Sequence, residues 1–413
     1  MTADDGRGEP DGPTGGCFGP GERPPSVEPA GFGMPDLDAE RAVYRAAGWT
    51  WAPEAEPDHP AEPDYVVEDP DIHGDTEGDD LWSYLMMHRR TGQQGYLDRA
   101  AAWARYFKED YLDCVGGEYA SFCYDRDAFG ACHLWGWGLV SWADVMDDAA
   151  ALAEAEAVAA VVEFLWSPET TFNCLPASAC TTYGVRQAAR HLLLVTRVAE
   201  ATGNPRWADL RDRIIDTVLA SEDWDAGRGM YFEGEWSTDE IMGAGSYAAG
   251  ARIVSPFQLG WLTEAFDHAY RTTGNEELRD RMVAMARFVD EYGLDPTYRY
   301  TGSTFGIVGG EVYHNYAAEE PVEFWDPVYT TSLVNTLVRG YRYTCDPHFY
   351  ERALTFFERG NKGIYGEPTE RAAPDGVVHH FVDSVFASAS GYFYLDYNKG
   401  ELQYTYLLFE PAD

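Results

Sequence analysis

The sequence predicts an all-α fold, an (α/α)5-6 toroid in which an inner ring of buried helices is wrapped by an outer ring of amphipathic helices. Two observations predict it. A short turn recurs along the chain at a regular interval, and the helices on either side of each turn differ in their hydrophobic pattern. One small C-terminal β-hairpin is expected beside the helices.

The recurring turn carries Thr followed by Gly or Cys and then by a polar residue. The threonines of the last three turns are spaced equally, at positions 202, 273 and 344. A weaker version stands at Met146-Asp147-Asp148. Such a period predicts stacked supersecondary units. The four clear turns are Thr91-Gly92-Gln93, Thr202-Gly203-Asn204, Thr273-Gly274-Asn275 and Thr344-Cys345-Asp346.

The helices differ in kind across each turn. After the turn, apolar residues such as Leu210, Ile214 and Val218 recur at helical spacing with charges between them, which predicts one solvated face. Before the turn, a segment such as 257–269 is apolar nearly all round, which predicts burial. A closed toroid requires these two layers, whereas an open solenoid leaves its inner helices more polar.

Five hairpins are clear in the pattern. A sixth would combine an early helix with the segment from Phe381, where Tyr392–Tyr397 and Glu401–Leu408 predict a β-hairpin around Asn398-Lys399-Gly400. Residues 64–413 are therefore expected to form a single toroid domain. Residues 1–63 are rich in Gly, Pro and acids and predict a flexible arm with one short helix.

Composition limits the partners. Acidic residues outnumber basic ones 70 to 30, for a formal charge of −40, and this field repels nucleic acid and anionic membranes. It favours adaptation to high salt, unless a preference for Arg over Lys merely reflects a GC-rich genome.

No apolar run is long enough for a membrane span. No leader with a basic and an apolar region is visible, so a cytoplasmic location is the default expectation; the oligomeric state stays open.

Long connections between hairpins are expected to meet at one rim, beside the N-termini of the inner helices. Loops of this length usually serve a function. The stretch 313–329 is the densest, with His314, Tyr316 and Asp326 as candidate acid/base groups and with Asn315 beside them. The connections are about Asp110–Cys132, Ser167–Thr182, Ser221–Ser255, Tyr292–Trp325 and Gly360–Val382.

Other candidates precede that stretch. His133 opens an inner helix as a possible proton-transfer group, and Asp80 is the partner expected for Asp326 in a two-carboxylate hydrolase. Arg186 is expected to bind a uronate carboxylate. The remaining predicted substrate-binding residues are Trp135, Trp137, Asn173, Tyr183, Trp325 and Tyr329.

No cofactor is expected, because the chain has no P-loop, no Rossmann glycine motif and neither of the HExxH and GxSxG motifs. No metal site is predicted either, although the acidic run 75–80 leaves room for a structural calcium ion. The evenly spaced Cys114, Cys123 and Cys132 lack the paired spacing of a zinc site and favour buried thiols or a disulfide.

The hairpin series, the segment His133-Leu134-Trp135-Gly136-Trp137-Gly138 and the Thr-Gly-Asn turns resemble the (α/α) toroid shared by many polysaccharide lyases and glycoside hydrolases. The resemblance covers roughly 80–383 and is one of architecture. In the lyases it implies that Asn315 or Arg186 neutralises a uronate, while His133 or His314 and Tyr316 move protons. In the hydrolases it implies roles for Asp326 and Asp80.

The leading prediction is cleavage of a carbohydrate by β-elimination at a uronate, because His, Asn and Tyr are adjacent at 314–316. Three alternatives stay open: an inverting glycoside hydrolase with two carboxylates, a sugar epimerase or isomerase, and a non-catalytic helical scaffold that binds a glycan or a protein. An enzyme predicts that His133, His314 and Asp326 converge, whereas a scaffold predicts that they are scattered.

Overall fold

The computed structural model describes three long stretches, 137–166, 184–293 and 327–361, with gaps at 233, 236–251 and 255. It also describes the short segments 305–308, 311–314, 386–387 and 393–394 and isolated positions from 85 to 104. The predicted arm 1–63 and the predicted hairpin partner 401–408 lie outside the described residues.

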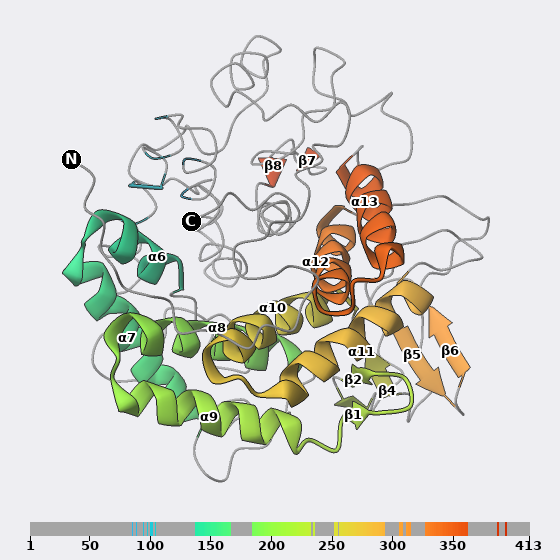
Figure 1. Cartoon of the computed structure of the whole chain (residues 1–413), viewed down its shortest axis with the longest axis horizontal. Helices are drawn as coiled ribbons and strands as arrows, with labels where there is room; N and C mark the ends of the chain where they lie inside the picture. The colour runs from blue at the N-terminus through green and yellow to red at the C-terminus, as the bar shows by residue number, and fades with distance from the viewer. Residues whose placement is uncertain are drawn as a thin grey trace.

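Eight helices in the described stretches form four consecutive hairpins. The inner members are α6 (Trp137–Met146), α8 (Gly184–Thr202), α10 (Pro256–Thr273) and α12 (Pro327–Thr344). The outer members are α7 (Ala149–Leu165), α9 (Pro205–Leu219), α11 (Glu276–Tyr292) and α13 (Pro347–Asn361). Inner helices contact one another in the order α6, α8, α10, α12, and each contacts its outer partner, so the hairpins follow an arc of two layers (Figure 1).

The same turn joins every hairpin. Its central residue has a left-handed backbone, with φ of 53° at Asp147, 61° at Gly203, 70° at Gly274 and 62° at Cys345. The next residue caps the outer helix, as when Asn204 accepts a bond from the backbone N–H of Arg206 at 3.0 Å. The turns predicted from the sequence at 202, 273 and 344 are therefore confirmed, and the weak copy at 146–148 is a turn of the same kind.

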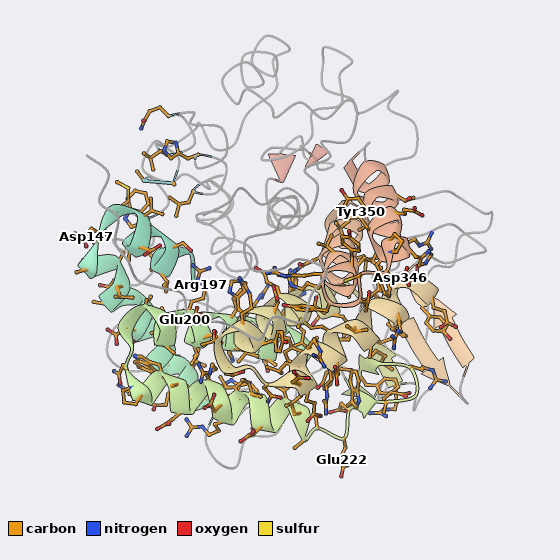
Figure 2. All side chains as sticks on the ribbon, in the orientation of Figure 1. Asp147, Arg197, Glu200, Glu222, Asp346 and Tyr350 are labelled. Atoms are coloured by element: carbon orange, nitrogen blue, oxygen red, sulfur yellow. The ribbon has the colours of Figure 1, made fainter. Side chains whose placement is uncertain are left out.

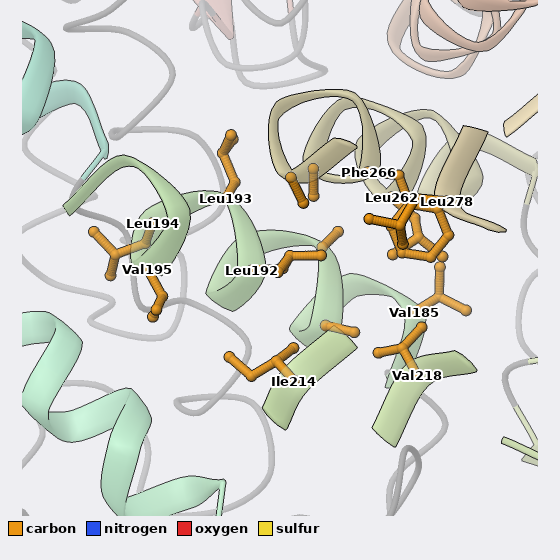
Figure 3. Packing of buried hydrophobic residues seen from close by; sticks show 14 of the residues in the cluster. Val185, Leu192, Leu193, Leu194, Val195, Ile214, Val218, Leu262, Phe266 and Leu278 are labelled. Carbon is orange, nitrogen blue, oxygen red and sulfur yellow. The ribbon is translucent and has the colours of Figure 1, made fainter. Parts of the chain in front are cut away.

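The core lies between the two layers. Leu192 and Val185 of α8 pack toward Ile214 and Val218 of α9, while Phe266 of α10 extends the cluster (Figure 3). All five side chains are fully buried. A buried aliphatic or aromatic side chain contributes about 1.5–3 kcal/mol, so this apolar seam holds the hairpins together.

The predicted long connections are present between α7 and α8, between α9 and α10, and between α11 and α12. The second and third carry β-structure that the sequence analysis did not predict. A four-stranded antiparallel sheet runs in the order β3 (Gly234–Glu235), β4 (Arg252–Val254), β5 (Phe305–Val308), β6 (Glu311–His314). Its strands come from two different connections, a long-range pairing that short strand patterns do not reveal.

Two further strand pairs are short. β1 (Trp224–Asp225) pairs with β2 (Met230–Tyr231), around a turn in which Gly229 has φ of 75°. At the C-terminal side, β8 (Phe393–Tyr394) falls within the predicted strand 392–397, and its partner among the described residues is β7 (Phe386–Ala387). The predicted strand is thus present in part, and its predicted pairing with 401–408 stays a prediction because that segment lies outside the described residues.

Candidate functional site

The inner helices carry a polar stripe on the face opposite the core. On α8 this stripe consists of Arg186, Arg190 and Arg197, which share one face because four and seven residues separate them. Arg197 lies on the concave side of the arc in Figure 2, whereas Glu222, which follows α9, lies on the convex side. The arginines of α8 therefore belong to the inner lining.

The first two turns of α8 hold two arginines against one tryptophan. The guanidinium carbons of Arg186 and Arg190 lie 5.3 Å and 4.6 Å from the centroid of the Trp261 ring, which belongs to the second turn of α10. Arg186 is 8% exposed and Arg190 is 2% exposed. Like charges four residues apart repel on a helix, and the face of an indole ring offsets that repulsion by attracting both cations.

This pair lies at the N-terminal ends of the inner helices, where the long connections enter. A guanidinium presents a planar fork of N–H donors that matches a carboxylate, and the dipole at a helix N-terminus favours negative charge. Both features favour an anion. Burial strengthens them, because the effective dielectric constant is lower away from water.

Lower along the same face, polar contacts join α10 to α12. The side-chain N–H of Asn335 donates to the carbonyl of Gly260 at 2.9 Å and reaches Glu264 at 3.5 Å. The hydroxyls of Thr263 and Thr336 lie 3.2 Å apart. These buried groups fix the spacing of the two helices, so they position the lining above them.

At the end of the inner helices that leads into the hairpin turns, the polar residues surround Asp267 of α10. This side chain is fully buried. Burial alone would raise its pKa, but the charges of Arg271, Arg342 and Arg339 outweigh burial and hold the pKa of this carboxyl well below its usual range. Burial and the charge of Asp267 raise the pKa of Tyr343, whose hydroxyl donates to that carboxylate. Asp267 therefore stays ionised and Tyr343 stays protonated.

Charge is unevenly divided between the layers. The four inner helices carry six arginines and four acidic residues. The four outer helices carry eight arginines and 13 acidic residues. The inner layer is thus net positive in a chain whose formal charge is −40, which makes the lining a local attractor for anions.

Four of the predicted site residues fall within the described elements. Arg186 lies in the inner lining, as just described. Trp137 is the first residue of α6 and Tyr329 belongs to the first turn of α12, so their backbones stand at the same end of the inner layer as Arg186. His314 ends β6, in register with Phe305.

The other predicted site residues lie outside the described residues, and their roles stay predictions. They are Asp80, His133, Trp135, Asn173, Tyr183, Asn315, Tyr316, Trp325 and Asp326. The same holds for the acidic run 75–80 proposed for calcium. Among the described residues, no group of three His, Cys, Asp or Glu side chains could hold a metal ion. No helix there is both long and apolar enough for a membrane span.

Sequence reasoning missed Arg190, Trp261, Asp267 and Arg339. The signal for Arg190 was present, because arginines at 186, 190 and 197 share one helical face. Trp261 was interpreted only as a core residue, although it is partly exposed and bears two cations.

No family model matches the sequence, and no curated protein is similar to it at the level of sequence. Solved structures do resemble it. Cellobiose 2-epimerase from Bacillus thermoamylovorans matches with a TM-score of 0.55 at 13% identity, covering 81% of this chain and 87% of that one. A polysaccharide lyase matches with a TM-score of 0.50 at 12% identity, covering 90% of this chain and 95% of that one.

A third match is a UGL variant with the saccharide dGlcA-Glc-Rha-Glc, with a TM-score of 0.52 at 16% identity, covering 81% of this chain and 85% of that one. Identities this low show the fold alone. The fold is the (α/α) toroid, which confirms the architecture predicted from the hairpins and their turns.

Proposed function

We propose that this chain is a carbohydrate-processing enzyme that acts on an acidic sugar, most specifically by β-elimination at a uronate. The observation that carries the proposal is the pair of guanidiniums, Arg186 and Arg190, held on the face of Trp261 at the loop end of the inner helices. The fold supports the wider class, since this toroid occurs in an epimerase and a lyase that act on carbohydrates.

In this proposal the two arginines bind the uronate carboxylate. Neutralising that charge makes the hydrogen on the neighbouring ring carbon more acidic, and proton abstraction followed by loss of the glycosidic oxygen gives an unsaturated sugar. The base and the acid are predicted among His133, His314 and Tyr316. The chain as a whole has a formal charge of −40, but the net positive inner layer supports binding of an acidic sugar there.

The test is to incubate the protein with a panel of uronate polysaccharides at high salt, following ultraviolet absorbance of the unsaturated product and reducing ends in parallel. Cleavage with both signals is expected. Reducing ends without absorbance would assign hydrolysis, with Asp80 and Asp326 as the carboxylates to test. Altered sugar stereochemistry without cleavage would assign epimerisation, and no change in any substrate would leave the scaffold hypothesis.

Arg186→Gln is the matched probe of the site, with Arg206→Gln as its control. Arg206 also stacks on a tryptophan, 4.3 Å from the centroid of Trp207, but it lies on outer helix α9 and is half exposed. Loss of a hydrogen bond to a charged group costs about 1.5–3 kcal/mol, or roughly 10- to 150-fold in kcat/KM. We expect that loss for Arg186→Gln and none for Arg206→Gln.

A further inference from the structure

Asp267 lies between three arginines from two inner helices. Its Oδ2 atom is 3.3 Å from Nε of Arg339, 3.6 Å from Nη2 of Arg271 and 3.8 Å from Nη1 of Arg342. Tyr343 donates its hydroxyl to the other oxygen, Oδ1. Among the described residues, the cluster thus contains three cations and one anion, and the tyrosine adds no charge.

Arg339 has few hydrogen-bond acceptors among the described residues. Arg339 is 2% exposed, yet the described residues give it only one long hydrogen bond, from Nη1 to the carbonyl of Asn335 at 3.5 Å. Its Nε is buried without a hydrogen-bond acceptor, and Oδ2 of Asp267 accepts no hydrogen bond from those residues either. A guanidinium has five N–H donors, and leaving a buried one unsatisfied is costly.

Charges of both signs surround the cluster. Arg197 of α8 interacts electrostatically with Arg271 of α10 and also with Glu200, Glu264 and Asp144. Burial lowers the pKa of His268 well below its usual value, and the charges of Arg271 and Arg197 lower it further. His268 is therefore neutral at pH 7, and its Nδ1 atom lies 3.3 Å from Nη2 of Arg271.

We propose that Arg339, Arg342 and Arg271 form an oxyanion-binding site, which takes a carboxylate, sulfate or phosphate group. Planar guanidinium forks match such groups in a bidentate manner. The side chains of Arg271 and Arg342 are 41% and 27% exposed, so a ligand can reach them from solvent. The site is distinct from Arg186 and Arg190, because it lies in the C-terminal halves of α10 and α12.

The experiment titrates sulfate into the full chain at constant ionic strength, with chloride as the compensating ion, and measures heat of binding and Tm. A saturable rise in Tm is expected, and saturable heat of sulfate binding should persist in the Arg186→Gln background, which lacks the other proposed anion site. Arg342→Gln should weaken the apparent Kd for sulfate at least about tenfold, the effect of one charge-assisted hydrogen-bonding partner. Arg279→Gln is the control, since Arg279 pairs with Glu276 and Asp280 on outer helix α11.

Arg342 is the residue to substitute because its side chain is partly exposed, so the variant is expected to fold. Arg339→Gln would instead change a buried side chain. Arg342→Lys keeps the charge but loses the fork, so it should bind sulfate with intermediate affinity. Absence of saturable binding to the wild type, or an unchanged Kd in Arg342→Gln, would overturn the proposal.

The source of the anion is resolved by competition. Glucuronate, with glucose as the neutral control, is added to sulfate-saturated protein in the Arg186→Gln background, which removes the other acidic-sugar site. Displacement of sulfate assigns the site to an acidic sugar, and binding of sulfate without displacement assigns it to an inorganic oxyanion. Either result supports the oxyanion-binding site. Neither result depends on catalysis, so the proposal for this site does not fail if the proposed function is wrong.

Discussion

The inner and outer helices of the arc share hairpins and turns but differ in how they use charge. On the outer layer, Arg206 pairs with Glu163, with side chains 51% and 32% exposed, and such surface pairs contribute at most about 1 kcal/mol. On the inner layer, Arg186 and Arg190 lie on an aromatic ring, and Arg339 lies beside the buried Asp267. Inner charges are therefore expected to decide ligand binding and conformational integrity, while outer charges set solubility.

The largest expected effect comes from Asp267→Asn. Removing the carboxylate that pairs with Arg271, Arg339 and Arg342 leaves the buried Arg339 without its charge partner among the described residues, which costs about 3–5 kcal/mol. Urea unfolding measures the change. Asp280→Asn is the control, because that carboxylate is 68% exposed and pairs with Arg279 on the outer layer; its effect should stay below about 1 kcal/mol.

The stability difference between the wild type and Asp267→Asn should also depend on pH. Since the folded-state pKa of Asp267 is depressed, its contribution to stability is present above the unfolded pKa of about 4 and is lost as the pH falls toward the folded value. The stability gap between wild type and Asp267→Asn should thus be widest near neutral pH and narrow on acidification below about pH 4. A gap that is constant with pH would contradict an ionised Asp267.

Trp261 should have the next largest effect, and on the ligand more than on the fold. We expect Trp261→Ala to weaken acidic-sugar binding roughly tenfold, because a desolvated cation–π contact is worth about 1–2 kcal/mol. Trp261→Phe keeps an aromatic face and should recover part of the loss. A KM that rises while kcat stays near wild type identifies a positioning residue; a fall in kcat alone would contradict that role.

The control for Trp261 is Trp207→Phe on outer helix α9. Trp207 is 2% exposed and donates to Glu156, so the substitution is expected to lower stability. It should leave the KM unchanged, because the arginine over this ring, Arg206, lies outside the lining.

The sequence predicted the repeated architecture because local signals specify it. A left-handed glycine followed by an asparagine cap, as at Gly203 and Asn204, is visible in the residues themselves. The two layers were visible in the periodicity. Arg186 could be proposed as an anion ligand, because an arginine in an apolar helix is unusual.

The features that the sequence did not predict depend on contacts between distant segments. Nothing local places Trp261 under Arg190, since their helices meet only through tertiary packing. The strands of the sheet pair across two separate connections, as when Arg252 pairs with Ile307, and strands this short carry little pattern of their own. Asp267 looked like one acidic residue among 70, and only its burial distinguishes it.

The hairpin turns join the two layers. Substitutions in a turn should have an intermediate effect on stability. Gly274→Ala should cost about 1 kcal/mol, since φ of 70° is unfavourable for a residue with a Cβ atom. Asn275→Ala should cost a similar amount through loss of the bond from the backbone N–H of Glu277. Thermal unfolding measures both, and activity per folded molecule should not change.

The smallest effect is expected on the outer surface. Asp209 and Asp216 are exposed on α9, in a chain with a formal charge of −40, so each adds self-repulsion that salt screens. Replacing both with Asn should raise stability at low salt by a few tenths of a kcal/mol and have no effect in 1 M NaCl. Thermal unfolding over a salt series measures the difference. Equal shifts at low and high salt would contradict an electrostatic cause and weaken the contrast between the layers.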